Sequence, residues 1–121
     1  MSTIAKGRWG ESLACRHLSD KGFQIIRRNW FFGHAELDLI AWDGPVLVIV
    51  EVRLLKRSNT WRPEQTVGRV KQRKIAAAAA AFADLTGYQG ELRFDIVGVS
   101  YGQDEVTTIR HFPDAFFPGL H

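Results

Sequence analysis

The stretch ELDLIAWDGPVLVIVEVRL, residues 36–54, decides how this chain folds. Residues 36–42 alternate between polar and apolar side chains, and residues 46–54 are strongly apolar and β-branched, so each half predicts a strand. Asp43, Gly44 and Pro45 between the two halves are typical turn residues. We therefore expect a β-hairpin whose second strand is buried.

The sequence on either side of this hairpin predicts helices and further strands. In chain order we expect a helix over 3–21, a strand over 23–32, the hairpin, a basic loop over 55–65, a helix over 66–86 and strands over 91–99 and 105–111. No repeat or linker divides the chain, so residues 1–121 are expected to form a single domain. The fold class is α/β, in αβββαββ order, with a mixed central sheet flanked by helices.

Composition excludes several classes of protein. The chain has 121 residues, of which 45% are apolar, which suits one domain with a real core rather than a disordered segment. No apolar run approaches the roughly 20 residues of a membrane helix, and no apolar segment follows Lys6 and Arg8, so a secretory signal is not expected. Cys15 is the single cysteine, so a disulfide framework and a zinc finger are excluded, and a cytoplasmic location is expected.

Positive charge is concentrated in the segment from Arg53 to Lys74. This segment holds eight basic side chains against one acidic side chain, a net charge of +7, which leaves −4 for the rest of a chain whose formal charge is +3. Such a distribution favours a polyanionic partner, above all nucleic acid, although a solvated basic surface is the alternative. The candidate nucleic-acid-binding residues are Lys56, Arg57, Trp61, Lys71 and Lys74.

Two carboxylates are expected to face each other across the hairpin. If Trp42 pairs with Leu47, Asp38 lies opposite Glu51, and facing Cβ atoms of an antiparallel pair are about 4.5–5.5 Å apart. Such close carboxylates repel each other unless a cation or a proton joins them. Asp38 and Glu51 are therefore candidate ligands of Mg²⁺ or Mn²⁺. The alternative is that both are edge-strand charges paired with arginines, namely Arg28 and Arg53.

Two helices carry charged residues on faces that are otherwise apolar. Glu11 shares a helix face with Ile4, Ala14 and Leu18, so it should point toward the sheet. Lys74 lies near the middle of an apolar stripe on the second helix. This stripe comprises Val67, Val70, Ala78, Ala81, Phe82 and Leu85. An acid, a base and a carboxylate pair could thus converge, although Lys74 could equally extend its ammonium to water.

The ordered set of short motifs resembles the small bacterial YraN-like family. The matching pieces are Gly10-Glu11 with Ala14 in the first helix, Asn29, residues 36–41 (ELDLIA), Glu51-Val52, Lys74 and Arg93-Phe94-Asp95. That family belongs to the PD-(D/E)xK restriction-endonuclease-like superfamily and is similar to archaeal Holliday-junction resolvases. The resemblance implies that Asp38 and Glu51 bind the metal, that Glu11 orients water or a second metal, and that Lys74 contacts phosphate.

One position departs from the family pattern, because Arg53 stands where the superfamily has its catalytic lysine. A buried lysine can lose its proton, whereas arginine effectively cannot. The leading hypothesis is a metal-dependent nuclease acting on structured DNA, with Glu11, Asp38, Glu51 and Arg53 as its catalytic residues. The alternatives are a binding module of the same fold with weak or lost catalysis, and an interaction protein with an acidic protein partner. By analogy with the resolvases, a homodimer is expected.

Overall fold

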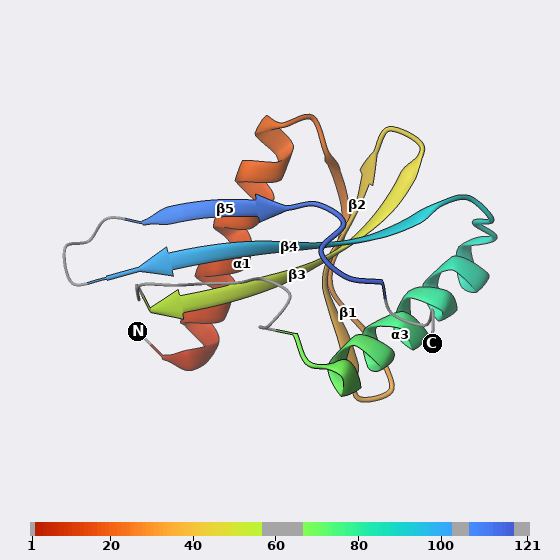
Figure 1. The fold of residues 1–121 in the computed structure, drawn as a ribbon, viewed down its shortest axis with the longest axis horizontal. Helices are drawn as coiled ribbons and strands as arrows, with labels where there is room; N and C mark the ends of the chain where they lie inside the picture. Colours follow the sequence, from red (N-terminus) through yellow and green to blue (C-terminus); the bar gives the residue numbers. More distant parts are fainter. Residues whose placement is uncertain (1, 57–66, 103–106, 118–121) are drawn as a thin grey trace.

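The computed structural model describes residues 2–56, 67–102 and 107–117, and it has the expected order of helices and strands (Figure 1). The elements are α1 (Thr3–Asp20), β1 (Gln24–Phe32), β2 (Ala35–Asp43), β3 (Val46–Lys56), α3 (Arg69–Thr86), β4 (Leu92–Tyr101) and β5 (Thr108–Phe112). The αβββαββ order and the α/β class are therefore confirmed.

The five strands form one mixed sheet in the order β1-β2-β3-β4-β5. Neighbouring strands are antiparallel except β3 and β4, which run parallel. A parallel pair needs a crossover connection, and α3 lies in the connection between β3 and β4. β3 is thus the central strand, which corrects the alternative interpretation that placed Glu51 on an edge strand.

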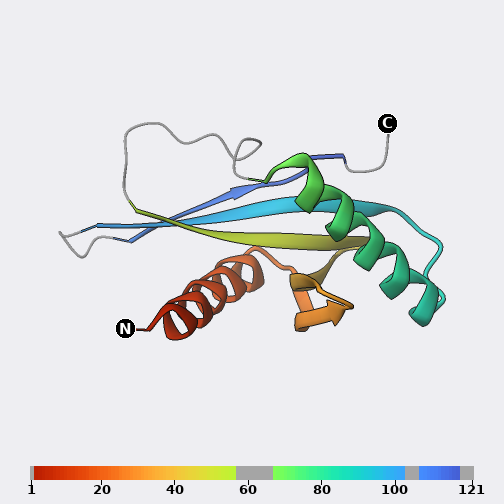
Figure 2. The ribbon, with the colours of Figure 1, turned by 90° about the horizontal axis from the view of Figure 1, so that it is seen from below.

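Two separate hydrophobic cores show that the helices cover opposite faces of the sheet. Leu39, Val48 and Val50 pack with Ala14 and Leu18 of α1. Ile40 and Ile49, their neighbours along the strands, pack instead with residues of α3. In Figure 2, α1 lies below β3 and β4, whereas α3 begins above these strands. Successive side chains of β3 are buried on alternate faces, which allows both faces of the sheet to be covered.

The helix boundaries are close to those expected, but the buried face of α3 differs. Ile75, Ala78, Ala79, Phe82 and Ala83 are buried, whereas two residues of the expected stripe, Val70 and Leu85, are 65% and 76% exposed. The alanine run offers small apolar side chains on every face, so periodicity did not define the direction of burial. Ile4 of α1 is likewise exposed. Within the described residues, no helix is long and apolar enough to span a membrane.

The other boundaries shift by one to three residues. β3 continues to Lys56, two residues into the expected loop, and α3 begins at Arg69 rather than 66. The last strand ends at Phe112, and the first two residues of its expected range lie outside the described residues. Element ends depend on local pairing and capping, which sequence patterns define poorly.

A buried polar network fastens β5 and the following segment to β4. Asp95 is fully buried and accepts two hydrogen bonds from Arg93, at 2.8 and 2.9 Å. It also bonds to His111 Nε2 at 2.7 Å and to the backbone N–H of Asp114 at 2.9 Å. Burial alone would raise the pKa of Asp95, but these bonds outweigh it and the pKa is lowered. The network is an ionised, satisfied part of the core.

Alanine substitutions at two glycines of α1 should change the free energy of unfolding in opposite directions. A Cβ at Gly10 would lie 2.9 Å from both Cγ and Cδ2 of Leu54, whereas a Cβ at Gly7 would meet nothing within 4 Å. Gly7→Ala should raise the free energy of unfolding by about 0.5–1 kcal/mol through helix propensity. Gly10→Ala should lower it, because overpacking costs about 1–3 kcal/mol. Urea unfolding measures both changes.

The double variant identifies the cause of the Gly10→Ala effect. In a Leu54→Ala background the clashing atoms are gone, so Gly10→Ala should become neutral or stabilising. A penalty that persists in that background would show that the contact with Leu54 does not limit how closely α1 approaches β3.

Candidate functional site

The hairpin has the expected register, and it opens at Asp38. Trp42 pairs with Leu47, and the pairing continues to Leu39 with Val50. Beyond that pair a side chain replaces the backbone pairing, because Asp38 Oδ2 accepts a hydrogen bond from the backbone N–H of Val52 at 2.8 Å. A carboxylate thus stands where β2 and β3 separate, and it is only 8% exposed.

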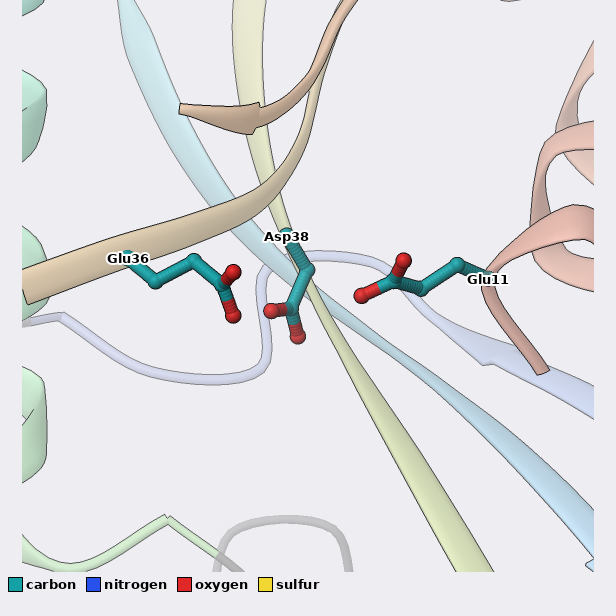
Figure 3. A group of neighbouring side chains, drawn as sticks. All are labelled: Glu11, Glu36 and Asp38. Carbon is teal, nitrogen blue, oxygen red and sulfur yellow. The ribbon is translucent and has the colours of Figure 1, made fainter. Parts of the chain in front are cut away.

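Three carboxylates from two elements converge at this opening (Figure 3). Glu11 extends from α1 and Glu36 from β2, and they point from opposite sides toward Asp38. Carboxylate oxygens of the three residues lie within 4.8 Å of one another. Hard divalent cations bind oxygen ligands grouped in this way.

We call Glu11, Glu36 and Asp38 the acidic cluster. Asn29 bridges two of its members, and one oxygen of the cluster has no partner within the described residues. The Asn29 side-chain amide donates to Glu11 Oε2 at 2.9 Å and to Glu36 Oε2 at 3.4 Å. Asn29 itself has a positive φ of 51° inside β1, a conformation that asparagine tolerates better than most residues. Glu11 Oε1 is buried and has no hydrogen-bond partner within the described residues. A cation between these oxygens would satisfy it, so the residues present fit a metal.

Burial makes the ionised forms of these acids unfavourable. It raises the pKa of Asp38 to about 9, with the nearby Glu51 carboxylate adding to the effect. Burial also raises the pKa of Glu51, although Lys71 and Arg53 act in the opposite direction. Near neutral pH, Asp38 therefore holds a proton that a bound cation would displace.

Glu51 is paired with a lysine that comes from α3. Lys71 Nζ lies 2.7 Å from Glu51 Oε1, whereas the Arg53 guanidinium reaches the same oxygen only at 3.9 Å. Arg28, which the alternative interpretation paired with these acids, donates instead to the Ser12 hydroxyl at 3.1 Å. The closest positive charge to the carboxylates is thus supplied across the sheet–helix interface.

A pocket of about 460 Å³ opens beside the acidic cluster, between the tip of the β1–β2 hairpin and α3. Its lining residues are His34, Ala35, Glu36, Asp38, Val70, Lys71, Lys74 and Ile75. Within the described part of the chain, Lys74 has no ion pair, so its ammonium is available to a ligand. The pocket therefore joins carboxylates, two cations and an apolar wall.

Most of the residues expected at the site lie in one neighbourhood. Contacts, pocket lining or electrostatic coupling link six of them: Glu11, Asp38, Glu51, Arg53, Lys71 and Lys74. Lys56 ends β3, and Arg57 and Trp61 lie outside the described residues. Glu36 and Asn29 join the site without having been predicted as site residues. Glu36 had a signal, because it precedes Asp38 by two and was expected to share its strand face.

The fold and the site together define a class of protein. It is a single-domain α/β protein with carboxylates grouped where β2 separates from the central strand β3. Comparison with known proteins assigns the family. Residues 10–99 match the model of the uncharacterised protein family UPF0102, and the chain belongs to that family. UPF0102 is the YraN family, so the expected family is confirmed. This family is consistent with the restriction-endonuclease-like superfamily.

The relatives match over nearly the whole chain. A UPF0102 protein of Chlorobium chlorochromatii is 40% identical, covering 96% of this chain and 94% of its own. Another from Anaeromyxobacter dehalogenans is 43% identical, covering 93% and 84%. A third from Rhodococcus jostii is 37% identical, covering 93% and 97%. Their names state no activity, so the chemistry must be argued from the site.

Asp38→Asn should stabilise the metal-free protein, and more so at high pH. The pKa of Asp38 rises from an ordinary 3.8 to about 9 on folding, so between these values the folded state binds a proton that the unfolded state has lost. Stability therefore falls as pH rises through this range, and asparagine removes that loss. In EDTA, the gain in unfolding free energy should be larger near pH 8 than near pH 5, as measured by urea unfolding.

Adding Mn²⁺ should make the parent more stable than Asp38→Asn, the reverse of their order in EDTA. A cation that binds only the folded state raises the melting temperature of the parent, and Asp38→Asn should lose most of that rise. Asp84→Asn, which removes an exposed carboxylate of α3, is the matched control and should keep it. Equal Mn²⁺ shifts in the parent and Asp38→Asn would contradict a metal site at the acidic cluster.

Proposed function

We propose that this protein is a metal-dependent, nuclease-like protein that binds nucleic acid, most readily structured DNA, and hydrolyses its phosphodiester bonds slowly at most. The observation that carries the proposal is the convergence of Glu11, Glu36 and Asp38 within 4.8 Å, with a buried Glu11 oxygen left without a partner. Carboxylates are not gathered and buried in this way for stability, because each ionised group loses hydration.

The proposed cation is Mg²⁺ or Mn²⁺, held by Asp38 with Glu11 and Glu36, and by Glu51 when Lys71 releases it. When bound, such a cation activates water and neutralises charge on the leaving oxygen. Asn29 orients Glu11 and Glu36 through its two hydrogen bonds. Lys71 and Lys74 lie on the same pocket and are placed to bind the substrate phosphate.

Arg53 supports a second candidate function, a nucleic-acid-binding module with weak or lost hydrolysis. Arginine keeps its charge, so at this position it can hold a phosphate but cannot accept a proton. Its guanidinium is one-third exposed and 3.9 Å from Glu51, a position compatible with a phosphate contact. The two candidates share the binding surface and differ only in turnover.

Arg53→Lys should increase cleavage. We expect weak or no cleavage of four-way junctions, flaps and single strands by the parent with Mg²⁺ or Mn²⁺. A lysine at this position can lose its proton, which arginine effectively cannot, and general base assistance is typically worth about 10²–10⁴-fold. Gel assays of initial rates compare the parent, Arg53→Lys and Glu51→Gln, the last of which should be inactive.

The outcomes separate the candidate functions. Strong cleavage by the parent that Arg53→Lys slows would make arginine the working residue. If neither protein cuts any of the substrates, hydrolysis should be abandoned in favour of the binding module.

Binding should be salt-dependent through the lysines of α3. Each phosphate contact releases condensed counterions, so the logarithm of affinity falls linearly with the logarithm of salt concentration. Replacing Lys71 and Lys74 by glutamine should reduce that slope by about two, one for each contact. The matched control replaces Arg8 and Arg16, two exposed cations of α1, and should leave the slope nearly unchanged. Affinity that ignores salt would favour an acidic protein partner.

A further inference from the structure

The pocket beside the acidic cluster has an inner and an outer end. Ile75 is 2% exposed and Asp38 8% exposed, so these lining residues form the inner end. His34, Val70 and Lys74 are exposed and form the rim. A ligand group that reaches Asp38 must therefore pass between the hairpin tip and the first turns of α3.

A half-exposed aromatic side chain, Phe32, lies next to the rim of the pocket. Phe32 pairs with Ala35 across the hairpin, and directly opposed residues of an antiparallel pair point to the same face. Ala35 lines the pocket, so Phe32 lies at its edge, where it is 49% exposed. Val70, on the opposite wall, is 65% exposed. Two large apolar groups thus face water on either side of the same opening.

The chemistry of the lining changes along the pocket in the order that a nucleotide would need. Val70, Ala35 and Ile75 of the lining offer an apolar surface to a base, and Phe32, which pairs with Ala35, offers an aromatic ring beside it. Lys71 and Lys74 offer positive charge to its phosphate, next to the acidic cluster. The volume of about 460 Å³ falls within the roughly 300–1,000 Å³ of pockets that enclose small molecules.

We propose that this pocket takes one unpaired nucleotide, so that the preferred ligand is a single strand or a duplex with an unpaired end or bulge. The inference rests on the proposed function, whose substrate class it names. In a continuous duplex the bases are stacked and paired, which leaves none available to Phe32. A phosphate that stays within a stiff duplex would meet the rim before it reached Asp38.

The test measures binding without cleavage. Fluorescence anisotropy with labelled oligonucleotides compares a single strand, a blunt duplex of the same sequence and that duplex with an unpaired overhang. Ca²⁺ replaces Mg²⁺, because it takes the same oxygen ligands in a looser geometry. The parent should bind the single strand and the overhang about tenfold more tightly than the blunt duplex, which corresponds to the loss of one base–aromatic stack.

Two uncharged substitutions test the rim directly. Phe32→Ala and Val70→Ser should remove most of the preference for unpaired strands and leave duplex binding nearly unchanged. The matched controls are Phe117→Ala and Leu85→Ser, which truncate exposed apolar residues that do not line the pocket, and they should keep the preference. All four positions are more than 45% exposed, so loss of folding is not expected, and thermal melts verify this.

Three results would overturn the inference. Equal affinity for the single strand and the blunt duplex, or a preference that survives both Phe32→Ala and Val70→Ser, would remove it while leaving the proposed function in place. Competition by free deoxyadenosine monophosphate at the concentration that displaces the oligonucleotide would assign the pocket to a small nucleotide instead of a strand. Absence of binding to all oligonucleotides would overturn both proposals, whereas the Mn²⁺ melts report on the metal site independently.

Discussion

Repulsion between buried carboxylates is the constraint on which this structure depends. Four acids, from α1, β2 and β3, lie close together where the hairpin opens, and Asp38 and Glu51 are almost inaccessible to water. Each neighbouring group offsets part of the cost: the Val52 N–H bonds Asp38, Asn29 bonds two glutamates, and Lys71 bonds Glu51. No hydrogen bond from the described residues reaches the last oxygen of Glu11, which leaves the cluster short of positive charge.

The hairpin was predictable because local patterns and burial agree there. Alternation over residues 36–42 and the apolar run over 46–54 allow one register that buries both faces, and the structure has that register. The closeness of Asp38 and Glu51 followed from this register. Where the period of a strand is two, a single offset determines which side chains meet.

The remainder depends on tertiary structure that a local pattern does not contain. Lys71 and Lys74 both line the pocket, but only Lys71 reaches Glu51, and the buried side of the alanine run decides this. Asn29 reaches the two glutamates from a left-handed backbone conformation, which the sequence pattern of β1 does not predict. His111 meets Asp95 because β5 pairs beside β4, although sixteen residues separate them. The resemblance to a family gave the helical acid Glu11 a role, whereas the place of Glu36 in the acidic cluster depends on how α1 packs beside β2.

The parallel pairing of β3 with β4 also constrains the order of assembly during synthesis. β1, β2 and β3 are sequence neighbours that pair antiparallel, so this part of the sheet can form as soon as residue 56 has emerged from the ribosome. β3 would then present a nearly bare apolar edge until β4, more than 40 residues behind it, arrives. Non-local parallel pairing forms slowly, so this interval is the period of greatest exposure to aggregation. The dense positive charge that follows β3 in the chain would keep such nascent chains apart.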